Sequence, residues 1–273
     1  MYNFIEVCSG AGGLSSGFIN KNFKPLLLND FDKTCCNTLE LNHNNCNIIK
    51  GSFVDIDFSK YKDIDILMGG VPCQSFSQAG KRKGLEDPRG NLLLEFIKIV
   101  DKIEPKIFLI ENVKGLTTHD EGNTFNSILD TINQLNKYKI YHKVLNANDY
   151  GVAQKRERLF IIGVHNKIKR KFKFPQKSEY KPVLKDVLIN VPISEGLKYS
   201  DEKKKIMDLV PQGGCWINLP EDIQKSYMKN SYYSGGGKRG IARRLSMEEP
   251  SLTLTTSPCQ KQTERCQEKL CFS

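Results

Sequence analysis

Long apolar runs are missing from this chain of 273 residues. No hydrophobic stretch approaches the length that a membrane-spanning helix needs. The opening residues also lack the basic and apolar regions of a signal peptide. These two absences exclude a membrane partner from the hypotheses and lead us to expect a cytoplasmic protein.

The cysteine spacing lacks the patterns of a metal site or a disulfide framework. Nine cysteines occur at irregular positions, and none forms a Cys-x-x-Cys pair. An odd number without paired spacing favours reduced thiols over disulfides or structural zinc. We therefore expect no metal.

Positive charge exceeds negative charge, since 41 Lys and Arg residues against 31 Asp and Glu residues give a formal net charge of +10. Between Lys167 and Lys181 the only acid is Glu179, and a second basic cluster, Lys238 to Arg244, follows a glycine triplet. A charged run is usually a solvated surface. Two such runs together favour a polyanionic partner.

The chain up to about Val164 alternates short apolar stretches with helical periodicity, which predicts an α/β fold with a doubly wound, mostly parallel sheet. Residues 91–103 and 124–135 carry the clearest helical patterns. The expected strands are Phe4 to Val7, Pro25 to Asn29, Asn47 to Lys50, Ile64 to Met68, Lys106 to Ile110, Tyr138 to Val144 and Arg158 to Val164.

After Val164 the sequence becomes rich in Lys, Pro, Gly and Ser, with weaker periodicity. We therefore expect two domains, residues 1–164 and a smaller, irregular domain at 165–273.

A glycine-rich turn, Gly10 to Gly13, follows the first expected strand. Such a turn lets backbone amides approach a ligand, although no Gly-Lys-Ser/Thr sequence of a phosphate-binding loop follows it. Asp30 ends the next strand, where it can bind a ribose or cap a helix, and Phe31 can stack on an adenine ring.

Three further positions at strand ends carry reactive groups. Cys73 follows an apolar strand and begins a Gly- and Ser-rich loop, so it is either a nucleophile or a buried thiol. Glu111 follows another strand. Arg156 and Arg158 alternate with Glu157, which predicts one strand face able to grip a carboxylate, a phosphate or a base carbonyl.

Taken together, Gly10-Ala11-Gly12-Gly13, Pro72-Cys73-Gln74, Glu111-Asn112-Val113 and Gln154-x-Arg156-x-Arg158 resemble, in order and spacing, the cytosine-5 DNA methyltransferase family. The resemblance covers residues 4–164. It implies that Cys73 adds to carbon 6 of cytosine and that Glu111 contacts ring nitrogen 3. It also implies that Arg158 contacts the base carbonyl and that Arg156 organises the cysteine loop.

The same resemblance implies a Rossmann-like domain that binds S-adenosylmethionine and releases S-adenosylhomocysteine. The residues expected to bind this cofactor are Cys8, Ser9, Gly10, Ala11, Gly12, Gly13, Asp30, Phe31, Ser52, Phe53, Pro72 and Leu92.

The implied partner is duplex DNA, from which the target cytosine must leave the stack. Residues 165–273 then form the target-recognition domain. The residues expected to contact DNA are Ser77, Lys81, Arg89, Arg239, Arg243, Arg244, Thr253 and Gln260.

Two departures qualify the resemblance. Ser52 stands where family members usually carry an acid, and the chain lacks the closing C-terminal segments of the family. We therefore expect weak or no activity from the isolated chain, either as a truncated product or as half of a split enzyme completed by a second polypeptide. A tRNA cytosine-5 methyltransferase and an inactive DNA- or cofactor-binding remnant are the alternative functions.

Overall fold

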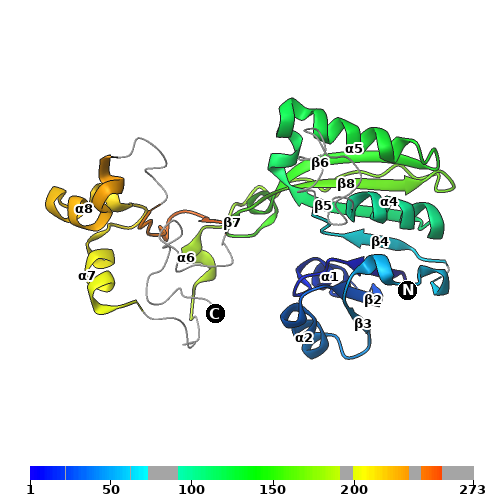
Figure 1. Ribbon diagram of the computed structural model, residues 1–273, viewed down its shortest axis with the longest axis horizontal. Coiled ribbons are helices and arrows are strands. Elements are labelled where there is room, and N and C mark those ends of the chain that lie inside the picture. Colours follow the sequence, from blue (N-terminus) through cyan, green and yellow to red (C-terminus); the bar gives the residue numbers. More distant parts are fainter. Residues whose placement is uncertain (22, 62, 73–91, 191–198, 234–240, 254–273) are drawn as a thin grey trace. The chain divides into compact units, whose positions relative to one another are not determined.

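A computed structural model describes residues 1–21, 23–61, 63–72, 92–190, 199–233 and 241–253 of the chain (Figure 1). Its contacts form two compact units. The first consists of Met1–Leu145 and Glu157–Pro175, and the second of Asn146–Arg156 and Gln176–Ser273. The domain boundary predicted at residue 164 lies inside the second segment of the first unit.

The first unit is built on a seven-stranded sheet with the order β3-β2-β1-β4-β5-β8-β6. The pairs β1–β2, β2–β3, β1–β4 and β4–β5 are parallel, whereas β5 and β8 are antiparallel. The doubly wound, mostly parallel sheet predicted from the sequence is therefore confirmed. Its strands are β1 (Asn3–Val7), β2 (Lys24–Asp30), β3 (Asn47–Lys50), β4 (Ile66–Gly69), β5 (Ile107–Val113), β6 (Tyr138–Asn146) and β8 (Glu157–His165).

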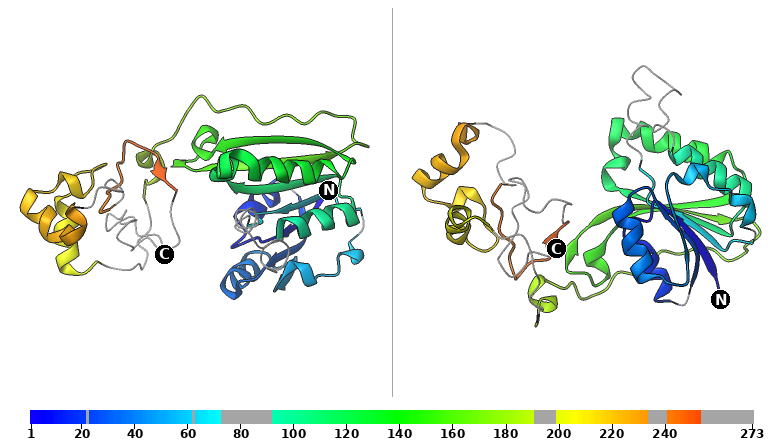
Figure 2. Two further views of the ribbon diagram at one scale, coloured as in Figure 1. Left: turned by 45° about the horizontal axis from the view of Figure 1, so that its top comes forward. Right: turned by 60° about the horizontal axis from the view of Figure 1, so that its bottom comes forward.

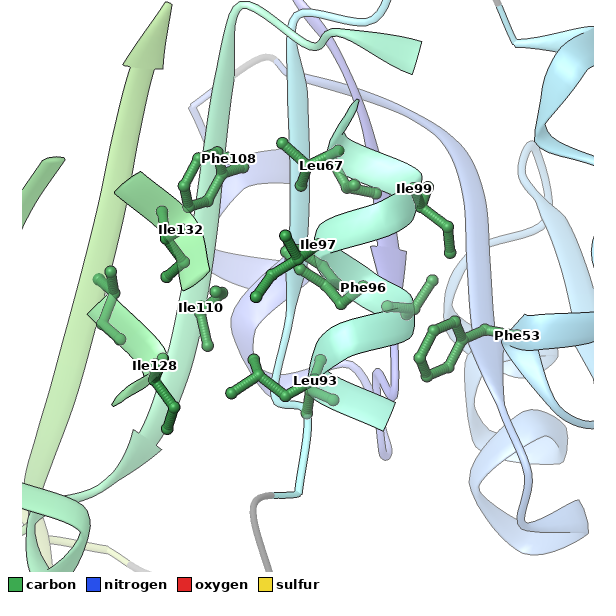
Figure 3. Packing of buried hydrophobic residues seen from close by; sticks show 14 of the residues in the cluster. Phe53, Leu67, Leu93, Phe96, Ile97, Ile99, Phe108, Ile110, Ile128 and Ile132 are labelled. Atoms are coloured by element: carbon green, nitrogen blue, oxygen red, sulfur yellow. The ribbon is translucent and has the colours of Figure 1, made fainter. Parts of the chain in front are cut away.

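Helices cover both faces of this sheet. On one face, α4 (Leu92–Ile103) and α5 (Asn123–Asn133) bury their apolar sides against β1, β4, β5 and β8. Figure 3 shows Leu93, Phe96 and Ile97 of α4 directed into this core. Each such side chain contributes roughly 1.5–3 kcal/mol when fully buried. On the other face, α1 (Gly13–Ile19) and α2 (Lys33–Asn42) pack on a smaller cluster around Phe4 and Leu39.

The second unit holds three α-helices in the described part of the chain, namely α6 (Leu184–Val187), α7 (Asp201–Leu209) and α8 (Glu221–Met228). A small core around Trp216 and Met207 joins α7 to α8. A two-stranded parallel sheet pairs β7 (Gln154–Lys155) with β9 (Ser251–Leu252), so segments far apart in sequence are held together.

No helix among the described residues combines the length and the apolar character needed to cross a bilayer.

Candidate active site

Strands β1, β4 and β5 lie side by side in the sheet (Figure 2). Because they are parallel, they end at one edge, which brings the sequence landmarks together. A Cβ atom placed on Gly70, just after β4, would lie 3.6 Å from the carbonyl oxygen of Cys8 and 3.6 Å from Oε2 of Glu111. The glycine turn, the end of β4 and the Glu111 carboxylate therefore meet at this edge.

The turn after β1 has a backbone that favours glycine. Gly10 and Gly12 have φ angles of 55° and 88°, and Cys8 also has a positive φ of 52°. The amide of Ser9 donates to the carbonyl oxygen of Asn29 at 2.9 Å, which ties the turn to β2. Left-handed conformations cost an L-residue roughly 1–2 kcal/mol, so the glycines relieve strain that Cys8 retains.

The glycines of the turn face different surroundings. A Cβ atom on Gly12 would lie 2.9 Å from Cδ2 of Leu39, so Gly12 is needed for packing against α2. Cβ atoms on Gly10 and Gly13 would meet no atom within 4 Å. Both positions, next to the amino end of α1, therefore leave room for a ligand to approach the backbone.

Asp30 holds the turn from β2. Its Oδ2 accepts the amide N–H of Gly10 at 2.7 Å, and its Oδ1 accepts that of Asp32 at 2.9 Å. The side chain that caps α2 is Asp32, which accepts the amide N–H of Thr34 at 2.7 Å. The alternative that Asp30 is the helix cap is therefore wrong. Phe31 is 79% exposed beside it, as an aromatic platform for a ligand requires.

Ser52 and Phe53 follow β3 and behave differently. The Ser52 hydroxyl accepts the amide N–H of Val54 at 3.3 Å, and Ser52 lines a cavity of about 460 Å³ with Asp55 and Tyr61. Phe53 is only 2% exposed, and its ring packs beside α4 in the main core (Figure 3). Any contact between Phe53 and a ligand is thus left to its backbone.

Cys73 lies outside the described residues, but the chain that leads to it is fixed. Nδ2 of the buried Asn112 donates to the carbonyl oxygen of Val71 at 2.9 Å. This bond joins the end of β5 to the chain directly after β4. Pro72 is exposed at the last described position before Cys73, and Leu92 is half-buried at the start of α4.

Glu111 and Arg158 form an ion pair between β5 and the antiparallel β8. Nε of Arg158 lies 3.0 Å from Oε1 of Glu111, and the two side chains are 19% and 24% exposed. The Arg158 guanidinium also donates to the carbonyl oxygen of Glu157 at 2.8 Å. Arg158 therefore holds the carboxylate in place while leaving it accessible.

Arg156 does not continue the β8 strand. Its amide N–H donates to the carbonyl oxygen of Gln154 at 3.0 Å, and its own carbonyl oxygen accepts the amide N–H of Ala147 at 2.9 Å. The first bond closes a tight turn, and the second joins Arg156 to the chain that follows β6. The single strand expected to carry Arg156 and Arg158 on one face is thus interrupted, and Arg156 belongs to the second unit.

Glu6 is a buried acid that the sequence analysis did not select. It is 1% exposed on β1, and its Oε2 has no hydrogen-bond partner among the described residues. Burial raises the pKa of Glu6 to about 8, and the charges of Asp30 and Glu111 act in the same direction. The sequence signal was an acid inside the apolar run Phe4-Ile5-Glu6-Val7.

Cys8 lies at the same edge as Glu111, but its thiol is a poor nucleophile. Burial raises its pKa to about 12, and the negative charges of Asp30 and Glu6 contribute. A thiol with such a pKa stays protonated near neutral pH and is a poor nucleophile.

The residues expected to contact DNA divide into two groups. Among the described ones, Arg243 is half-buried, and Arg244 donates from its guanidinium to the carbonyl oxygen of Val210 at 2.8 Å. The Thr253 hydroxyl donates to the carbonyl oxygen of Lys155 at 3.0 Å, beside the β7–β9 pair. Ser77, Lys81, Arg89, Arg239 and Gln260 lie outside the described residues.

Within the described ranges, no group of three or more His, Cys, Asp or Glu side chains is arranged to hold a metal ion.

Comparison with known proteins places this geometry in a family. The family model for C-5 cytosine-specific DNA methylase matches residues 2–269. The type II methyltransferase M.Sau96I of Staphylococcus aureus is 48% identical over 97% of this chain and 63% of its own length. M.Eco47II of Escherichia coli is 46% identical over 97% of this chain and 66% of its own length. The chain thus spans less than two thirds of these relatives.

Among solved structures, a candidate DNA modification methyltransferase encoded within an Escherichia coli prophage has the same fold. It superimposes with a TM-score of 0.63 at 22% identity, over 93% of this chain and 82% of the other. The sequence match over nearly the whole chain agrees with this likeness, and the chain belongs to the C-5 cytosine-specific DNA methylase family.

Proposed function

We propose that this chain carries the active site of an enzyme that transfers a methyl group from S-adenosylmethionine to carbon 5 of cytosine in a short duplex DNA site. The observation that supports it most is the Glu111 carboxylate, paired with Arg158 at 3.0 Å. This carboxylate lies at the sheet edge that also holds the glycine turn and the chain leading to Cys73.

The described residues at the glycine turn fit the proposed cofactor. The space over Gly10 and Gly13 suits its methionine portion, Asp30 has the oxygen acceptors that ribose hydroxyls require, and exposed Phe31 suits an adenine ring. Ser52 supplies a hydroxyl where family members usually carry an acid. When bound, S-adenosylmethionine supplies an electrophilic methyl group and leaves as S-adenosylhomocysteine.

The proposed chemistry assigns a step to each side chain. The Cys73 thiolate forms a bond to carbon 6 of cytosine, and the electron pair displaced from the 5,6 double bond makes carbon 5 nucleophilic. Glu111 holds or donates a proton at ring nitrogen 3, and Arg158 keeps its carboxylate oriented and reaches the base carbonyl. After methylation, carbon 5 loses its proton to solvent, and the electrons of that bond expel the Cys73 thiolate.

Of the two thiols Cys8 and Cys73, only Cys73 is the nucleophile in the proposal. Cys8 lies at the active edge, but its raised pKa of about 12 keeps it protonated. Cys73 therefore acts without competition from Cys8.

The second unit is the proposed target-recognition domain. Chemistry on a stacked base requires the cytosine to be flipped out, at a cost of roughly a few kcal/mol. The pairing of β7 with β9, and the bond from Thr253 to Lys155, join the two segments of this unit. Neither the comparisons nor the described residues support a second polypeptide, which the sequence left open as one of two explanations.

Transfer of a radiolabelled methyl group separates the candidate functions. We expect weak labelling of duplex DNA by the chain and no labelling by the Cys73→Ser variant. Labelling of tRNA alone would favour the tRNA methyltransferase. Cofactor or DNA binding without any labelling would favour an inactive remnant.

A further inference from the structure

Residues 166–175, here called the basic segment, follow β8 in the first unit. They include Lys167, Lys169, Arg170, Lys171 and Lys173 and contain no acid. The sequence alone leaves open whether such a run is a solvated surface or a binding surface. The structure distinguishes the cations that are already paired from those that are not.

Acidic partners neutralise only part of the charged run. Lys167 lies 3.9 Å from Glu104, and beyond the segment Lys177 and Lys181 lie 2.7 and 2.8 Å from Asp149. The other cations of the basic segment are exposed and have no ion pair among the described side chains. They are Lys169, Arg170, Lys171 and Lys173. These cations are available to an external anion.

Aromatic contacts anchor the basic segment to the sheet. The ring of Phe172 lies 5.5 Å from that of Tyr141 on β6 and 5.0 Å from that of Phe174. At its start, the amide of Asn166 donates to the carbonyl oxygen of Lys137 at 2.8 Å. Figure 2 (left) shows the chain after β8 running back along the sheet. Less ordering entropy is therefore lost when this segment binds than when a free loop binds.

The neighbouring surface is also basic. Strand β6, whose Tyr141 contacts the segment, forms the edge of the sheet, and its Lys139 and Lys143 are exposed. Nζ of Lys143 lies 5.7 Å from the centre of the Phe174 ring. A cavity of about 530 Å³ opens at the segment, and its lining residues are Ile107, Val164, Ile168, Arg170, Lys171, Phe172 and Lys173.

This surface starts away from the active edge. Ile107, in the cavity lining, is the first residue of β5, whereas Glu111 lies four residues farther along the strand. At about 3.3 Å per residue, the two positions are separated by about 13 Å. An anion held at the cavity is therefore distinct from the target base.

We propose that the basic segment binds phosphates of duplex DNA outside the recognition site and so supplies affinity that is independent of sequence. This inference rests on the proposed function for its choice of duplex DNA. The repeated charge of a phosphate backbone matches a row of fixed, unpaired cations better than a single small anion does. Each phosphate that a cation neutralises changes the slope of log K against log salt by roughly 0.9.

The test compares two triple variants of the full chain. Lys169→Gln, Lys171→Gln and Lys173→Gln remove three charges from the basic segment. Lys21→Gln, Lys24→Gln and Lys102→Gln remove three charges from other exposed positions of the first unit. Binding to a duplex without a target site is measured as a function of salt. We expect the first variant to lose roughly 0.9 of slope per lost contact and the control to keep the wild-type slope.

Charge-preserving Lys→Arg changes at 169, 171 and 173 should keep the wild-type slope. An unchanged slope in the Gln variant of the segment overturns the inference, and so does an equal loss in the control. Binding that is lost for tRNA but not for duplex DNA also overturns it. Methyl transfer is measured on the same preparations. If methyl transfer is normal and the Gln variant of the segment keeps the wild-type slope, only the role of the basic segment is rejected. If the slope of that variant is reduced but the wild type transfers no methyl group to DNA, only the proposed function is rejected.

Discussion

Nε of Arg158 lies 3.0 Å from Oε1 of Glu111, so an arginine from β8 holds a carboxylate near the end of β5. If this pair orients the group that acts on ring nitrogen 3, its loss should slow chemistry more than it weakens DNA binding. We expect Arg158→Gln to lower the single-turnover rate by about 10²-fold or more, the usual range for acid–base catalysis. Arg158→Lys should retain part of the rate. A wild-type rate in Arg158→Gln would show that Arg158 has no role in the chemical step.

The glycines of the turn should respond differently to a methyl group. In Gly12→Ala the new Cβ meets Leu39 and the backbone keeps a φ of 88°, so we expect a loss of about 1–3 kcal/mol in the free energy of unfolding. In Gly10→Ala the Cβ enters open space, so we expect a smaller loss in stability but weaker binding of S-adenosylmethionine. Thermal unfolding and calorimetric titration measure the two effects. Undiminished cofactor binding by Gly10→Ala would contradict the claim that the cofactor lies over Gly10.

Glu6 should make stability depend on pH. Its pKa is raised from 4.5 to about 8 by burial, so the folded protein keeps the proton after the unfolded chain has lost it. Stability is therefore highest below about pH 4.5 for this group and falls as the pH rises to about 8. The loss at pH 7 is on the order of 3 kcal/mol.

Glu6→Gln should remove this dependence on pH. The stability of the variant relative to the wild type should therefore be greater at pH 8 than at pH 5. Urea unfolding of both proteins across this range measures the difference. Parallel pH profiles for the two proteins would show that Glu6 is not protonated in the fold.

Asn112 should contribute both to the stability of the fold and to the reactivity of Cys73. Its Nδ2 donates to the carbonyl oxygen of Val71 at 2.9 Å, two residues before Cys73. Asn112→Asp keeps the shape but removes the donor, which leaves a buried oxygen unpaired at a cost of about 1–3 kcal/mol. We expect lower thermal stability and slower adduct formation by Cys73. Slower adduct formation should persist at temperatures where the variant is fully folded, and an unchanged rate there would limit Asn112 to a structural role.

Local patterns were enough to predict the strands and the two longest helices of the first unit. The strand expected at Asn47 to Lys50 corresponds to β3, and the helical pattern at 91–103 corresponds to α4, because alternation and helical period are set by nearby residues. The convergence of Glu111 with the glycine turn also followed, since parallel strands end at a common edge.

Long-range pairings could not be predicted in this way. β7 pairs with β9, and Asp149 takes Lys177 and Lys181 out of the basic run, although neither contact has a local pattern. The break at Arg156 accompanies a backbone hydrogen bond from its amide N–H to Gln154, which alternation of side chains does not reveal. Glu6 was missed because a single acid in a strand looks like a surface position until burial is known.

Covalent trapping tests the central claim, the role of Cys73, most directly. Duplex DNA in which 5-fluorocytosine replaces the target cytosine cannot release the enzyme, because fluorine replaces the proton that carbon 5 must lose. With S-adenosylmethionine present, we expect an adduct that survives denaturation for the wild type and for Cys8→Ser, and none for Cys73→Ser. An adduct that persists in Cys73→Ser, or that disappears only in Cys8→Ser, would contradict the proposed mechanism.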